Sequence, residues 1–100
     1  MRFIFDQKIE VKRPTLYSAH EEYFKVGYIY GMIMTLKAED VILTDGDPSK
    51  GFKLITDIDT DIKEADMLVY DGDKYIVKAI RKYNFRSLSR IEAFIYKANN

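Results

Sequence analysis

Three carboxylates at alternate positions, Asp57, Asp59 and Asp61, are the residues whose spacing most resembles a reactive or binding motif. They match the opening of a calcium-binding loop, in which alternate carboxylates converge on one hard cation. The rest of the loop does not follow, because Ile62 stands where the sharp turn needs glycine and Leu68 stands where a bidentate glutamate belongs. The sequence therefore predicts a solvated acidic turn and no metal site.

Groups for catalysis are scarce. His20 is the single histidine and the chain has no cysteine, which excludes histidine-based zinc sites, serine triads with a histidine base, and thiolate nucleophiles. Carboxylates are numerous enough for a glycosidase, but a chain of 100 residues has little room for the deep cleft that such an enzyme needs. The five glycines match neither a phosphate-binding loop nor a dinucleotide fingerprint. We expect no catalytic residues, no cofactor and a role other than that of an enzyme.

A second group of chemically interesting residues lies near the C-terminus, where cations alternate with aromatic side chains. Its members are Arg81, Lys82, Tyr83, Phe85, Arg86 and Arg90. Arginine and aromatic residues are enriched in protein interfaces, so we expect a partner-binding loop, or one whose cations are solvated or meet the acidic stretch. The alternative is a small module that binds single-stranded nucleic acid, because such a segment can follow phosphates and stack bases.

Composition places the chain among small folded proteins. One hundred residues predict a single domain spanning 1–100 with one modest core. The 16 basic residues balance the 16 acidic ones, so no global field would hold nucleic acid or an anionic membrane. The N-terminal apolar run ends at Asp6, which is too early for a signal peptide, and the run over residues 28–36 is far shorter than the ~20 residues of a membrane helix. We expect a soluble, unexported protein without membrane contact.

Alternation of apolar residues predicts the strands that hold these groups. Residues 2–12 alternate, and residues 23–37 give the strongest signal, a long central strand that is apolar on both sides. Gly27 and Gly31 within it suggest bends or bulges. A strand that is apolar on both sides in so small a protein implies a second covering layer, and a neighbouring subunit could supply it.

The remaining pattern is also that of β-structure. Residues 38–50 are rich in turn formers and predict the longest loop, and residues 52–56 begin the next strand. Ile58 and Ile62 could pin one helical turn, Asp71 and Gly72 predict a tight hairpin turn, and residues 91–95 form a last strand. The predicted fold is all-β, or β with one short helix: a small β-barrel of about five or six mostly antiparallel strands with one long loop.

Residues 28–97 resemble the head-completion, or stopper, proteins of long-tailed bacteriophages, which are small barrels that form a ring beneath the portal and adaptor. The resemblance is carried by GFKLIT at residues 51–56, the acidic stretch ending Asp61-Ile62-Lys63, MLVYDG at residues 67–72 and the returning strand 75–80. It implies a structural virion protein at the head-to-tail neck, assembled in the host cytoplasm. Implied partners are copies of itself, portal or adaptor proteins, tail terminator or other tail proteins, and genomic DNA that passes without sequence-specific binding. Adaptor, tail-completion and tail-terminator proteins have similar hairpins and remain alternatives.

The resemblance also assigns roles by position. It implies a channel loop of Glu39, Asp40, Thr44, Asp45, Gly46, Asp47, Pro48, Ser49 and Lys50, which closes or lines the DNA channel. Like charges in this loop would let DNA pass without sticking. In a ring, the expected subunit interface is formed by Tyr28, Ile29, Tyr30, Ile33, Phe94 and Tyr96. The segment before residue 23 departs from the resemblance.

Overall fold

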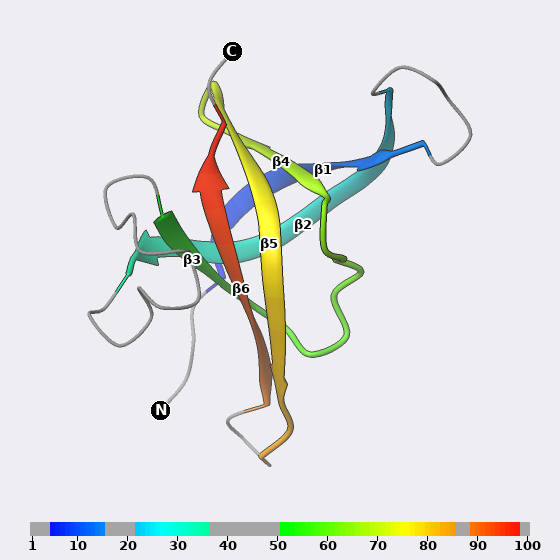
Figure 1. Ribbon diagram of the computed structural model, residues 1–100. Coiled ribbons are helices and arrows are strands. Elements are labelled where there is room, and N and C mark those ends of the chain that lie inside the picture. Colours follow the sequence, from blue (N-terminus) through cyan, green and yellow to red (C-terminus); the bar gives the residue numbers. More distant parts are fainter. Residues whose placement is uncertain (1–4, 16–21, 37–50, 86–88, 99–100) are drawn as a thin grey trace.

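Six antiparallel strands form a closed barrel in the computed structural model, which describes residues 5–15, 22–36, 51–85 and 89–98 (Figure 1). The strands are β1 (Gln7–Pro14), β2 (Tyr23–Thr35), β3 (Gly51–Thr56), β4 (Met67–Tyr70), β5 (Asp73–Tyr83) and β6 (Arg90–Lys97). Their order around the barrel is β1-β2-β3-β6-β5-β4, and β1 closes the ring by pairing with β4. The predicted all-β barrel is confirmed, and the described residues contain no helix.

The core is formed by the inward-facing residues of these strands. Ile9 and Val11 of β1, Leu54 of β3, and Ile91 and Ile95 of β6 are fully buried within it. The period-two pattern of the sequence places these five residues on one face of their strands, as the barrel requires. Burying an aliphatic side chain of this size contributes about 1.5–3 kcal/mol, so each member of this cluster adds substantially to stability.

The two apolar faces of β2 lie in different environments. Ile29 is buried in the core and Ile33 packs against it, whereas Tyr28 and Tyr30 are 51% and 54% exposed. Gly27 has φ 148° and lies beside a register shift between β1 and β2, so the predicted bulge is confirmed there. Gly31 does not mark a bulge. It lies where β3 approaches β2 so closely that a Cβ atom would collide with it.

The β5 strand changes face part of the way along. Tyr75 and Val77 point into the core, as the alternation predicts, but the register against β6 shifts between Val77 and Ala79. After this bulge the residue that packs on the core is Ile80, and Ala79 instead pairs with Phe94. Strict alternation along the sequence would place Tyr75, Val77 and Ala79 on one face, and this prediction is wrong for Ala79 because of the bulge.

The acidic connection between β3 and β4, residues 57–66, is held to the barrel by its apolar members. Ile62 is buried and Ile58 packs against the core cluster, so both residues anchor the connection. Ile58 lies in a turn and Ile62 in irregular backbone, so the predicted helical turn is absent. The connection ends on β5, where Ala65 donates its amide to the Val77 carbonyl and Val77 donates its amide to the Asp66 carbonyl. Asp57, Asp59 and Asp61 lie exposed, as predicted for a solvated turn.

The β4–β5 hairpin turn has the predicted two-residue form. Asp71 and Gly72 have φ of 51° and 82°, and Tyr70 pairs with Asp73 on either side of them. Two consecutive positive φ values match the twist of the flanking strands, which is why Asp-Gly is favoured at this place.

We expect Gly72→Val to lower the free energy of unfolding by about 1–3 kcal/mol, because a β-branched residue is strained at positive φ. Gly72→Asn is the matched control, since asparagine tolerates this backbone region, and its effect should be smaller. Urea titrations of both variants measure the difference. Equal unfolding midpoints for Gly72→Val and the parent would contradict the strain argument.

Candidate interaction surface

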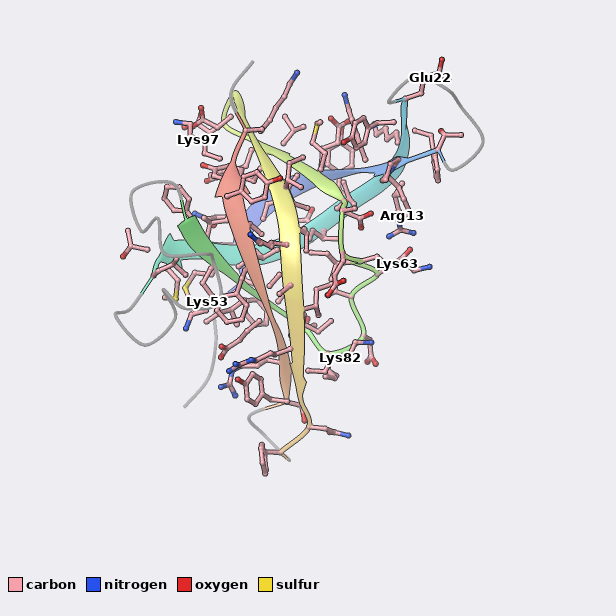
Figure 2. The ribbon with its side chains drawn as sticks, in the orientation of Figure 1. Arg13, Glu22, Lys53, Lys63, Lys82 and Lys97 are labelled. Carbon is pink, nitrogen blue, oxygen red and sulfur yellow. The ribbon has the colours of Figure 1, made fainter. Side chains whose placement is uncertain are left out.

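An ion pair between partly exposed Arg13 and fully buried Asp66 fixes the acidic connection beside the base of the β1–β2 hairpin. Asp66 is fully buried, and its carboxylate accepts hydrogen bonds from Arg13 Nε at 2.9 Å, Arg13 Nη2 at 2.9 Å and the Lys63 amide at 2.8 Å. Arg13 Nη2 also donates to Asp61 at 3.1 Å. The hydrogen bond to Asp66, above all, raises the pKa of Arg13, so the guanidinium stays charged. Figure 2 shows Arg13 near the segment that carries Lys63.

Next to this pair, a groove of about 400 Å³ separates β2 from the acidic connection. It is lined by Val11, Val26, Gly27, Tyr28, Ile29, Tyr30, Asp57, Thr60 and Asp61. Five of these residues are consecutive in β2. Because successive side chains of a strand point to opposite faces, a groove lined by consecutive residues runs along the edge of the strand. The groove therefore presents three kinds of group to a binding partner: the β2 backbone, apolar side chains and a rim of carboxylates.

One residue that lines the groove, Tyr28, lies close to two cations. The ammonium groups of Lys8 and Lys25 each lie 4.5 Å from the ring centroid of Tyr28. Lys25 Nζ donates to the Tyr28 hydroxyl at 3.2 Å, which raises the pKa of Lys25, and lies 3.6 Å from a carboxylate oxygen of Glu10. Together with Phe24, which is 51% exposed, these residues give the outside of β2 an aromatic and charged character typical of protein interfaces.

The structure divides the six residues expected at a subunit interface. Tyr28, Tyr30 and Tyr96 are exposed on the barrel wall. Ile29 and Ile33 face the core, so their expected place at an interface is corrected. Phe94 is also corrected, because it is fully buried within the single chain, under the Arg81 guanidinium at 5.6 Å from its ring. Strand periodicity alone could not separate the buried from the exposed residues of β2 in this set, since both faces of β2 are apolar.

The basic segment is also placed differently from the expected loop. Arg81, Lys82 and Tyr83 belong to β5, and Arg90 begins β6, so these residues lie on an extended hairpin. The Arg90 guanidinium stacks on Tyr83 at 4.4 Å, and its Nε donates to Glu92 at 2.7 Å. Lys82 and Phe85 are exposed near the hairpin end, and Arg86 lies outside the described residues.

A second set of buried charges lies on the outer side of β3 and β6. Lys53 Nζ is 3.7 Å from Glu92 Oε1, and both residues are less than a tenth exposed. Neither these charges nor the Arg13–Asp66 pair was singled out from the sequence. Nothing in the local pattern distinguishes Asp66 from the solvated acids just before it, because its partner is 53 residues away.

Two further expectations concern loops and metals. All nine residues of the expected channel loop, 39–50, fall outside the described residues. Within the described residues, no group of three or more acidic or histidine side chains is placed to hold a metal ion. No helix there is long and apolar enough to cross a membrane.

Comparison with known proteins finds likeness only at the level of structure. No protein-family model matches the chain, and no curated protein is significantly similar to it. The fold is similar to that of protein SF1141 from Shigella flexneri 2a, with a TM-score of 0.65, 8% identity, and coverage of 93% of this chain and 92% of that one. It is also similar to protein xkdH of the phage-like element PBSX from Bacillus subtilis, with a TM-score of 0.53, 9% identity, and coverage of 91% and 92%. At these identities the likeness establishes the fold.

Proposed function

We propose that this chain is a structural protein of a bacteriophage particle, and more specifically a component of the head-to-tail connector. In this role it forms a ring below the portal or adaptor, closes or lines the DNA channel, and offers the surface to which the tail attaches. It acts by assembly and not by catalysis. Its partners are other copies of itself, adaptor or portal proteins, tail terminator or tail proteins, and DNA that passes without sequence-specific binding.

The observation that carries the proposal is the closed six-strand barrel, whose fold is similar to that of a phage-like element protein over nine-tenths of both chains. The chain resembles head-completion proteins in the strands of this same barrel. The exposed aromatic side chains of β2 add support, because Tyr28 and Tyr30 offer contact area to a neighbouring subunit. The alternatives are adaptor, tail-completion and tail-terminator roles, in which the same fold would occupy another position in the neck.

A binding module for single-stranded nucleic acid is the second candidate, supported by exposed Lys82 and Phe85 at the end of the hairpin. A gel shift with oligonucleotides at low salt separates the two functions. Binding by the monomer would favour the module, whereas a connector protein should leave the oligonucleotides unshifted.

We expect the loop at residues 39–50 to be needed for DNA retention. In phage carrying the gene, replacement of residues 45–49 by a short Gly-Ser link should leave the isolated protein folded, since stability depends only logarithmically on loop length. Heads should fill with DNA and then lose it before tails attach. Counting filled heads, empty heads and infectious particles by electron microscopy and plaque assay measures this outcome.

The double variant Asp45→Asn, Asp47→Asn is the control that keeps loop length and removes charge. Loss of DNA only with the shortened loop would mean that the loop closes the channel by its length. Loss with both variants would mean that its charge matters as well. Normal retention and infectivity with the shortened loop would overturn the stopper assignment and favour an adaptor or tail-terminator role.

A further inference from the structure

The half of β2 that borders the groove has one unpaired backbone edge. On one side, β1 pairs with β2 from Tyr23 to Gly31. On the other side, β3 pairs only with residues 31–35, so no strand in the described part of the chain pairs with residues 23–29 there. Thr56 Oγ1 donates to the Tyr30 carbonyl at 2.7 Å, which closes the edge at that point. An open edge of this length is a template for another strand.

The bulge beside Gly27 and the charge of Lys25 give this edge only part of the usual protection against such pairing. Natural proteins cover edges, shorten them or place inward-pointing charges on them. Here the groove leaves space along residues 26–30, and the neighbouring side chains Phe24, Tyr28 and Tyr30 are large, aromatic and about half exposed. The rim opposite is acidic, with Asp57 and Asp61 both exposed. A matching strand would therefore carry basic and aromatic side chains.

The β5–β6 hairpin supplies such a strand. β4 pairs with β5 only over Asp73 to Ile76, and the acidic connection adds bonds at Val77. Among the described residues, no strand pairs with that edge of β5 over residues 78–83. The segment is basic, and Lys82 and Phe85 are exposed toward its end. Figure 1 shows the hairpin projecting beyond the barrel, with Lys82 low on it in Figure 2.

We propose that the β5–β6 hairpin of one copy docks along the β2 edge of the next copy, with β5 adding to β2 as an intermolecular strand and Lys82 meeting the Asp57 rim. The inference rests on the proposed ring and names its subunit contact. The hairpin and groove are different surfaces of the same chain, so the contact is head-to-tail, and repetition of such a contact gives a closed ring or a filament. Main-chain pairing supplies affinity, and the charged rim supplies register.

The test uses charge exchange between two exposed positions of the full-length protein. Lys82→Glu places a carboxylate against the acidic rim, and Asp57→Lys places a cation against a basic hairpin. Each variant alone should assemble at least tenfold more weakly than the parent, as measured by native mass spectrometry and sedimentation velocity. An equimolar mixture should assemble again, because contacts between the two variants then join opposite charges. Lys74→Glu, exposed at the other end of β5, is the matched control and should assemble like the parent.

Hydrogen exchange is a second measurement, because a change of charge alone would not alter the protection of backbone amides. Amides of residues 23–29 and 78–83 should become protected when the parent assembles. Assembly of both single variants like the parent, or a mixture that stays dissociated, would overturn the hairpin contact and leave a ring built through another surface. A parent chain that stays monomeric at millimolar concentration would contradict both the contact and the self-assembled ring.

Discussion

Asp66→Ala is expected to destabilise the protein by about 3 kcal/mol, the upper end of the range for hydrogen bonds to a charged group, because Asp66 is fully buried whereas Arg13 is partly exposed and keeps Asp61 as a partner. The substitution takes away the acceptor of both Arg13 bonds and leaves the Lys63 amide without its carboxylate partner. For a domain of about this size, each kcal/mol lowers the melting temperature by roughly 4–8 °C. Thermal unfolding followed by circular dichroism should therefore show a fall of more than about 12 °C.

Asp61→Ala is the matched control for this prediction. Its side chain is 63% exposed and also bonds to Arg13, so solvent screens the interaction and the loss should be about 0.2–1 kcal/mol. Arg13→Ala completes a double-mutant cycle with Asp66→Ala, and the two losses should be strongly non-additive because each removes the same pair. Additive losses would show that Asp66 stabilises the connection through the Lys63 amide alone. Equal effects of Asp61→Ala and Asp66→Ala would contradict the importance of burial.

Gly31→Val is expected to destabilise the protein by about 3 kcal/mol, at the upper end of the range for overpacked cores. A Cβ atom at Gly31 would lie 2.7 Å from Leu54 Cδ1 and 2.8 Å from the Ile55 carbonyl oxygen. The leucine side chain can move, but the carbonyl belongs to the β2–β3 ladder and cannot shift without loss of pairing. Chemical unfolding of Gly31→Ala and Gly31→Val should give graded losses.

Thr35→Val is a control on the same strand, where the side chain is exposed and the effect should be within about 0.5 kcal/mol. A Gly31→Val protein as stable as the parent would mean that β2 and β3 can separate locally at little cost. The wall of the barrel would then be less rigid than the close approach of the two strands implies.

Several features of this fold follow from the sequence alone. Alternation identifies the buried face of β1, because a strand with one apolar and one polar face has only one way to lie on a core. Asp71-Gly72 predicts its turn, since few residue pairs accept two positive φ values. The count of histidines and cysteines limits the chemistry without any structure. The alternate aspartates at 57–61 predict a solvated turn, and their side chains are exposed in the structure.

Other features were decided by the tertiary structure. β2 is apolar on both sides, so only the closing of the barrel determines that Ile29 faces inward and Tyr28 outward. The bulge at Val77 redirects β5 because the register against β6 shifts there, and no local residue signals it. The Asp66 carboxylate is buried and bonded to Arg13, which comes from a strand far away in the chain. Local patterns report what a residue prefers, whereas burial of a charge and the choice between two apolar faces depend on contacts distant in sequence.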